Sequence, residues 1–170
     1  MTPAARIQAS IEILDEILAG NPVEKSLTNW ARRSRFAGSK DRAAIRDHVF
    51  SAIRCKRSYA ALGGSETGRG LMIGAVRAAA GRLDDLFSGA RHAPSIVSEA
   101  EVGRDFKTDA ERFDIPEWLW PRFQSSLGNQ TVSVAQALQH RAPVHLRVNL
   151  IKTDVSTAIA ALAAEDITAV

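Results

Sequence analysis

The stretch SKDRAAIRDHVFSAIRCKR, residues 39–57, combines an apolar stripe with closely spaced cationic side chains. With about 100° between successive helical residues, four apolar residues fall on one side of a helix: Ile45, Val49, Ala52 and Ile53. We expect this helix to begin near Ser39 or Asp41. The spacing therefore predicts a helix that packs its apolar side against a core and leaves most of its arginines in solvent.

The charge around this stretch differs from that of the rest of the chain. The whole chain has 22 basic and 19 acidic residues, a net charge of +3. Residues 30–60 contain nine Lys and Arg but only two Asp, a net +7, so the remaining residues carry −4. A basic block on a folded domain suggests a polyanionic partner, with nucleic acid the first candidate. A solvated face with counterions is the other interpretation.

Composition excludes several classes of protein. A hydrophobic content of 45% and a charged content of 24% are typical of a globular chain, and 170 residues suffice for one domain or slightly more. No apolar run approaches the roughly 20 residues of a membrane span. The single cysteine, Cys55, can form neither an internal disulfide nor a zinc cluster alone. We expect a cytoplasmic monomer with no membrane and no metal partner.

Other helices are expected on both sides of residues 39–57. Thr2 and Pro3 resemble a helix N-cap and first turn, and Gly20 is a natural stop. A second short helix should span residues 23–30, and an alanine-rich helix should span residues 71–83. Small residues recur four apart at the start of the latter, namely Gly70, Gly74 and Ala78. They would let a neighbouring helix approach closely, so we predict an all-α bundle of about five short helices.

An acidic segment follows the predicted bundle, and the pattern of the sequence changes from Ile115. Seven acidic residues mark residues 95–120 as a linker or lid without chemistry of its own: Glu99, Glu101, Asp105, Asp109, Glu111, Asp114 and Glu117. A helix should start at Pro116 and another should span residues 132–140. Residues 144–150 then alternate apolar and polar side chains, the period of a half-buried strand. A helix over residues 155–164, capped by Thr153 or Asp154, and a second strand from residue 167 would follow.

This β-α-β unit would end as its second strand begins, so we expect the chain to be the front part of a longer protein. No catalytic, cofactor-binding or metal-binding residue emerges from its motifs. The Gly68-Arg69-Gly70 segment lacks the preceding strand of a nucleotide loop and is interpreted as helix packing. The four histidines have no metal-binding spacing, and Cys55 has no histidine partner nearby in sequence, so it reads as a plain thiol.

The basic block predicts an RNA-binding surface. Its candidate residues are Arg32, Arg33, Arg35, Lys40, Arg46, Arg54, Lys56 and Arg57. Arg42 lies close to the apolar stripe, so we expect it to form an ion pair with an acid of the first helix. Phosphate contacts would make binding fall steeply with salt. Arginine also stacks on unpaired bases, which favours structured RNA with loops.

Two groups of residues resemble known families. The opening, from Ala5-Arg6 through Asp41-Arg42 to Ile53-Arg54, resembles the helical NusB-like RNA-binding domain. The stretches IPEWL at 115–119 and PVHLRVN at 143–149, with Lys152-Thr153, resemble the front of Sun/Fmu-type RNA (cytosine-5-)methyltransferases. In that family a NusB-like domain precedes a ferredoxin-like or RRM-like module and then an S-adenosylmethionine-binding Rossmann domain.

The resemblance implies a mainly α chain. A NusB-like domain at 1–92 would be followed by an acidic linker with connecting helices at 93–142 and the start of a ferredoxin/RRM-like α+β module at 143–170. The chain would position ribosomal RNA for a methyltransferase domain that it does not contain. S-adenosylmethionine is implied only for the parent protein. The family's two catalytic cysteines have no counterpart here, so we expect this region to be inactive. By the same resemblance, Arg147, Asn149 and Lys152 would help to hold RNA.

Two alternatives remain open. The chain could be a free-standing NusB-like factor in transcription antitermination, although the unfinished β-α-β unit argues against this. It could also be a helical protein-interaction module that uses its alanine-rich surface.

Overall fold

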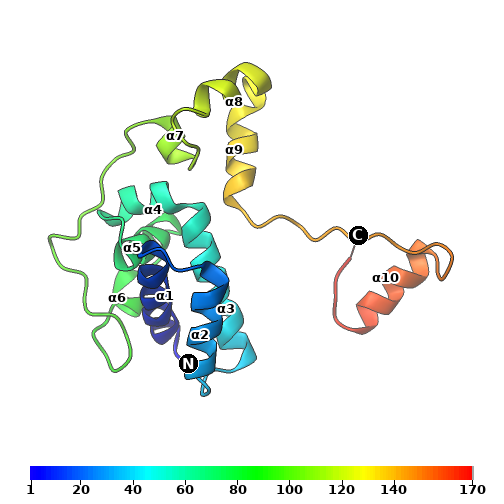
Figure 1. Ribbon diagram of the computed structural model, residues 1–170, viewed down its shortest axis with the longest axis horizontal. Coiled ribbons are helices and arrows are strands. Elements are labelled where there is room, and N and C mark those ends of the chain that lie inside the picture. Colours follow the sequence, from blue (N-terminus) through cyan, green and yellow to red (C-terminus); the bar gives the residue numbers. More distant parts are fainter. Residues whose placement is uncertain (170) are drawn as a thin grey trace.

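A computed structural model describes residues 1–169, and within them all regular elements are helical (Figure 1). The first six helices are α1 (Pro3–Leu18), α2 (Val23–Arg33), α3 (Ser39–Arg54), α4 (Lys56–Gly63), α5 (Gly68–Ala78) and α6 (Leu83–Leu86). They are followed by α7 (Asp109–Arg112), α8 (Trp120–Leu127), the 3₁₀ turn η1 (Gly128–Gln130), α9 (Thr131–Gln139) and α10 (Val155–Ala164). The mainly α prediction is confirmed.

The helix α1 begins and ends as its sequence predicts. The Thr2 hydroxyl accepts a hydrogen bond from the backbone N–H of Ala5 at 3.2 Å, and Pro3 occupies the first turn, where its missing N–H costs nothing. The chain leaves the helix through Gly20, whose φ of 98° is strained for any residue with a Cβ. Local chemistry therefore sets both ends of this helix.

The main core lies among α1, α2, α3 and α5. The apolar stripe of residues 39–57 faces it as predicted, since Ile45, Val49 and Ala52 are fully buried and Ile53 packs at the edge. Other large side chains of this core are Ile13, Leu14, Leu71, Met72, Ile73 and Phe87. The first six helices thus form one body around a single core, which fixes where the basic residues of α2 and α3 lie.

The predicted ion pair between Arg42 and the first helix is wrong. Arg42 is exposed, and its Nε donates a hydrogen bond to the carbonyl of Ala37 at 3.0 Å. The ion pair that joins the two helices has the opposite polarity, because Asp41 of α3 accepts from Nε of Arg6 in α1 at 2.8 Å. The amino group of Met1 lies 3.2 Å from the same carboxylate. Asp41 points toward α1 because it sits one position earlier on the helix than Arg42.

Small residues bring α4 and α5 into backbone contact. A Cβ at Gly63 would overlap the carbonyl of Gly70, and a Cβ at Gly74 would overlap the carbonyl of Tyr59. The spacing of small residues therefore does serve close helix packing, as predicted. The sequence pattern predicted one helix over residues 39–57, whereas the structure has two helices, α3 and α4. They are separated at Cys55, whose φ of −105° and ψ of 31° differ from helical values.

The acidic segment after α6 is a connection without long helices, but three of its carboxylates form internal ion pairs, those of Glu101, Glu111 and Glu117. Glu101 accepts from Arg69 and from the N–H of Ser98, and hydrogen bonding by Arg69 lowers the Glu101 pKa to about 2. Glu111 accepts from Arg104 at 2.5 and 2.8 Å, and these bonds lower its pKa to about 2. Ion pairs therefore hold parts of the predicted linker in defined positions.

Replacing Glu111 with Gln should weaken the acid dependence of stability. Hydrogen bonding by Arg104 lowers the pKa of Glu111 from its ordinary value of 4.5 to about 2 in the folded chain, so folding favours the ionised form. This contribution is present above pH 4.5 and is lost as the pH falls toward 2. Urea unfolding between pH 2 and 6 should show a shallower pH slope for Glu111→Gln than for the wild type. Equal slopes would contradict the ion pair, and exposed Glu12→Gln is a suitable control.

The predicted strand over residues 144–150 is not formed. These residues run as an extended connection between α9 and α10 (Figure 1), and Val144 and Leu146 are 74% and 72% exposed. A strand needs a neighbour to accept its backbone hydrogen bonds, and residues 1–169 supply none beside it. The following helix α10 is confirmed, with the Asp154 side chain accepting from Thr157 N–H at 2.8 Å. Residues 167–169 are irregular, and Val170 of the second predicted strand lies outside the described residues.

Candidate nucleic-acid interface

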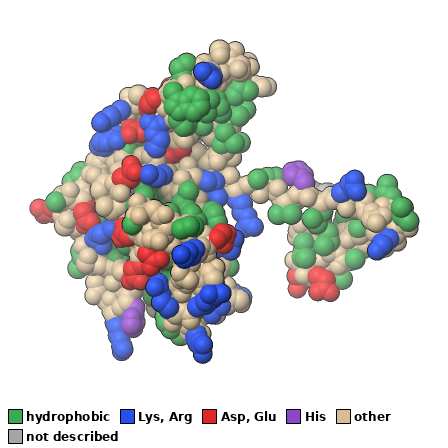
Figure 2. Space-filling model, in the orientation of Figure 1, with side chains coloured by type: hydrophobic (Ala, Val, Ile, Leu, Met, Phe, Trp, Pro, Cys, Tyr) green, Lys and Arg blue, Asp and Glu red, His purple; other side chains and the backbone are tan. Residues whose placement is uncertain are grey.

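Three of the predicted cations are free for a ligand. Arg32 lies in the last turn of α2, Arg35 follows in the α2–α3 loop, and Lys40 lies in the first turn of α3. All three are exposed, and within residues 1–169 none has a carboxylate oxygen within 4.0 Å. Figure 2 shows Lys and Arg side chains over α2 and α3. The aromatic ring of Phe36, 74% exposed, lies in the same loop. We call Arg32, Arg35, Phe36 and Lys40 the loop cluster.

Three other predicted cations form exposed ion pairs. Arg33 lies 3.0 Å from Glu16, Arg46 lies 2.6 Å from Glu24, and Lys56 lies 2.5 Å from Glu66. Solvent-exposed pairs of this kind contribute about 0–1 kcal/mol, because water screens them and two long side chains must be ordered. A phosphate can therefore replace the carboxylate at small cost.

Arg57 has a structural role that its sequence did not reveal. One of its terminal nitrogens donates to the carbonyl of Ile115, and the other lies 2.6 Å from Glu117. Hydrogen bonding by Arg57 lowers the pKa of Glu117. The carboxylate of Asp114 accepts from the backbone N–H groups of Arg57 and Ser58, so it caps the start of α4 from a distant part of the chain. Arg57 therefore joins the helical body to residues 114–117.

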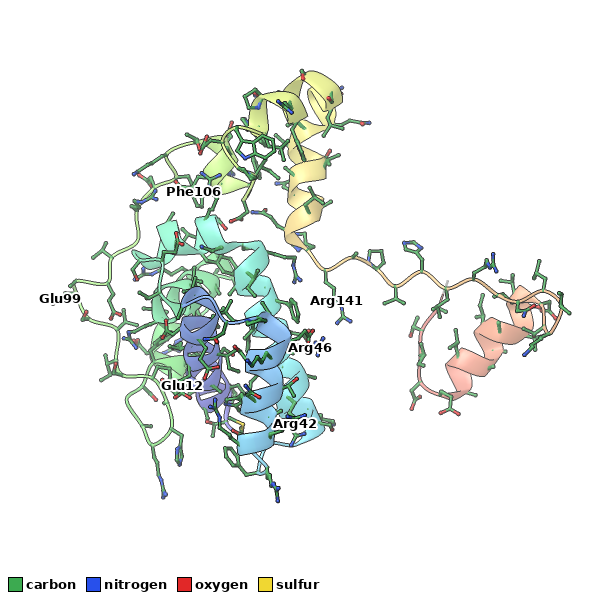
Figure 3. All side chains as sticks on the ribbon, in the orientation of Figure 1. Glu12, Arg42, Arg46, Glu99, Phe106 and Arg141 are labelled. Atoms are coloured by element: carbon green, nitrogen blue, oxygen red, sulfur yellow. The ribbon has the colours of Figure 1, made fainter. Side chains whose placement is uncertain are left out.

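Arg54 lines a pocket on one face of α3. This pocket of about 320 Å³ is bounded by Ala43, Arg46, Asp47, Phe50, Arg54 and Arg141. Sequence reasoning missed Arg141, although its position directly after the predicted helix 132–140 marks it as a residue at a helix end. Figure 3 shows Arg141 beside Arg46, directed from the chain after α9 toward α3. The fold thus adds an arginine from a remote segment to the basic face of α3.

The three predicted residues of the C-terminal part lie apart from α2 and α3 (Figure 1). Arg147, Asn149 and Lys152 are exposed on the extended connection and the turn that follows it. The Asn149 side chain accepts from the N–H of Ile151 at 3.1 Å, and its carbonyl accepts from the N–H of Lys152 at 2.9 Å. Asn149 thus shapes the turn before α10. Arg147 and Lys152 are the cations of this segment that a ligand could reach.

The thiol of Cys55 lies in an environment that disfavours its thiolate form. The residue is buried, and its Sγ lies 3.6 Å from the carbonyl of Gln139. Burial raises the pKa of the thiol, and the nearby Asp114 carboxylate raises it further. Its basic neighbours in sequence do not reverse this. In the described part of the chain no three His, Cys, Asp or Glu residues lie together as metal ligands, and no helix is long and apolar enough to cross a membrane.

The glycine-rich start of α5 is filled by the protein itself. The N–H of Gly68 donates to the carboxylate of Asp15 at 2.7 Å, and a Cβ at Gly68 would overlap the carbonyl of Ile11. The helix N-terminus therefore packs against α1 and offers no room for a cofactor phosphate.

Comparison with known proteins finds a similarity in the C-terminal third of the chain. Residues 115–170 match the family model described as the ferredoxin-like domain of RsmF/B-like methyltransferases. The matched segment includes α8, α9, the extended connection and α10. No curated protein and no solved structure matches the chain. The NusB-like character of the first helices stays a prediction, as does the division at residues 92 and 142.

Proposed function

We propose that this chain, whose residues 115–170 match the model of the ferredoxin-like domain of RsmF/B-like methyltransferases, is the RNA-binding region of a ribosomal RNA cytosine-5 methyltransferase. It binds RNA and presents it to a methyltransferase domain elsewhere in the protein. S-adenosylmethionine is the methyl donor of that domain. The glycine-rich start of α5 does not fit this cofactor, because the N–H of Gly68 already donates to Asp15 and the N–H of Gly70 already donates to the Thr67 hydroxyl.

The observation that carries the proposal is the loop cluster. It places three unpaired cations and one exposed aromatic ring on a single loop and its two flanking helix ends. Cations neutralise phosphates, and an exposed ring offers a surface on which an unpaired base stacks. The exposed pairs of Arg33, Arg46 and Lys56 extend the basic surface, because phosphate can displace their carboxylates. Arg147 and Lys152 provide a second basic segment on the matched domain.

The match also bears on the two alternatives. A methyltransferase-associated domain after the helical body favours RNA positioning over a free-standing transcription factor. A protein-interaction module built on the small-residue surface is disfavoured, because Gly63, Gly70 and Gly74 are used in the contact between α4 and α5.

Filter binding to a ribosomal RNA hairpin at several salt concentrations tests the proposal. The affinity of the wild type should fall steeply with salt. Replacing Arg32, Arg35 and Lys40 together by alanine should reduce the slope of log K against log salt by about 2, because each phosphate contact to single-stranded RNA contributes roughly 0.7. A flat response of the wild type would overturn the proposal.

The matched control replaces Arg82, Lys107 and Arg122, which are exposed and lie outside α2, α3 and the loop cluster. This variant loses the same charge and should keep most of the salt slope. Equal losses in both triple variants would mean that total charge, and not the loop cluster, determines binding.

A further inference from the structure

We propose that the pocket between α3 and Arg141 is a binding site for one nucleotide of single-stranded RNA, with the phosphate on the arginines and the base against Phe50. The inference rests on the proposed RNA-binding function and assigns it a specific subsite. We call this pocket the arginine pocket.

The walls of the arginine pocket come from one face of α3. Its α3 residues recur three or four apart, at positions 43, 46, 47, 50 and 54, so their side chains project in the same direction. Ala43 has a small side chain and leaves the space open. The volume of about 320 Å³ is at the lower end of the range for small-molecule sites. That size suits a phosphate and part of one nucleoside better than a larger ligand.

The charge of the arginine pocket favours an anion. Three guanidinium groups face one carboxylate, that of Asp47. Arg141 lies 3.7 Å from Asp47, a long separation for an ion pair, and both side chains are mostly exposed. Arg46 is held by Glu24 of α2 in an exposed pair. Neither of these two ion pairs is buried and bidentate. A phosphate can therefore compete with Asp47 for Arg141 and with Glu24 for Arg46.

Arg54 provides an independent indication that the arginine pocket takes a hydrogen-bond acceptor. Its Nε is buried and has no hydrogen-bond acceptor within residues 1–169. A buried donor without an acceptor is costly, and such groups call for an explanation. A phosphate oxygen in the pocket would supply the acceptor for the guanidinium group. Arginine is suited to this role because its planar fork of N–H donors matches two oxygens of a phosphate.

Phe50 supplies the surface for the base. The guanidinium carbon of Arg46 lies over its ring, 5.3 Å from the ring centroid. A stacked arginine and phenyl ring form a flat, partly cationic platform, which is a common partner of unpaired bases. A peptide carboxylate would use the arginines but would leave this platform unused. The combination therefore favours a nucleotide over an acidic peptide.

The position of Arg141 gives the pocket a role beyond affinity. Arg141 belongs to the segment that matches the ferredoxin-like domain, whereas the other walls belong to α3 of the helical body. A nucleotide in the pocket would contact both parts at once. The extended connection continues from Arg141 to Arg147. An RNA strand bound in the pocket could therefore contact a further cation, Arg147, in the matched domain.

The test uses the full 170-residue chain and two readouts. In filter binding, Arg54→Lys should lower the affinity for a single-stranded ribosomal RNA loop about tenfold, because it keeps the charge but loses the Nε–H and the planar fork. Arg82→Lys, exposed and outside both the arginine pocket and the loop cluster, is the matched control and should change the affinity little. In NMR, the Arg54 Nε–H signal should shift on titration with uridine 5′-monophosphate. Melting temperatures of both variants check that they fold.

The outcomes separate the pocket from the proposed function. Wild-type RNA binding with no loss in Arg54→Lys or Arg141→Ala would overturn the pocket and leave the RNA-binding function standing. Failure of the wild type to bind RNA would overturn the proposed function, and the Arg54 signal would then decide the pocket by itself. A shift with uridine 5′-monophosphate would support a nucleotide site. No shift, or a shift with polyglutamate only, would overturn it.

Discussion

Replacing Asp114 with alanine is expected to destabilise the protein by about 3 kcal/mol and to release residues 109–139 from the helical body. The Asp114 carboxylate accepts from the backbone N–H of Arg57 at 2.8 Å and of Ser58 at 2.9 Å. It also accepts from the Ser58 hydroxyl at 2.7 Å and from the side-chain amide of Gln139 at 2.6 Å. Alanine would leave these donors, several of them partly buried, without an acceptor.

Thermal unfolding and amide hydrogen exchange measure the effect of this variant. Exchange should accelerate at Arg57 and Ser58, where α4 loses its cap. Asp114→Asn is the matched control, because asparagine keeps an acceptor oxygen and tolerates the φ of 59° found at this position. It should retain most of the stability. An Asp114→Ala variant as stable as the wild type would show that the contact does not join the two parts.

The variant Gly74→Ala is expected to destabilise the protein by about 3 kcal/mol. Its Cβ would overlap the backbone carbonyl of Tyr59, so relief requires α4 and α5 to move apart. Both helices contact the core through other side chains, and a shift would disturb Leu71 and Met72 beside it. Flexible side chains can rotate away from an added methyl group, but a helix backbone cannot.

A Gly→Ala change elsewhere in the chain controls for the change in unfolded-state entropy. At Gly38 an added Cβ would lie 3.7 Å from the Asp41 carboxylate, an ordinary contact. Gly38→Ala should therefore cost less than about 1 kcal/mol, mostly from the loss of a favourable N-cap residue. Urea unfolding of both variants gives the comparison. Similar destabilisation by the two substitutions would contradict close backbone packing of α4 and α5.

The contacts of Asp114 and Arg57 between residues 114–117 and the helical body decide which basic residues are suitable for mutational tests of RNA binding. Charge reversal at Arg57 would break its contacts with Ile115 and Glu117 as well as any contact with RNA. A loss of RNA binding in that variant would have two explanations. Arg46, Arg32 and Arg54 are cleaner probes, because their contacts in the described residues do not hold the two parts of the chain together.

Periodicity and capping were enough to predict the helices that position the basic surface. The N-cap residues Thr2 and Asp154 and the apolar stripe of α3 act through neighbours within one or two turns, which are visible in the sequence. The prediction of a strand at residues 144–150 was wrong because strand formation depends on a partner that is distant in sequence. Alternation describes which side of a strand is apolar, but a strand forms only when another strand accepts its hydrogen bonds.

The amino-acid sequence by itself therefore determined an α-helical body with a concentrated positive charge, because helix formation and net charge depend on residues that are close together in the sequence. It could not specify what each cation contacts. Arg57 joins two segments, Arg46 lies over Phe50, and Arg141 reaches α3 from beyond α9. Those roles were decided by tertiary folding, since Coulomb attraction and hydrogen bonding act over a few ångströms in space regardless of separation along the chain.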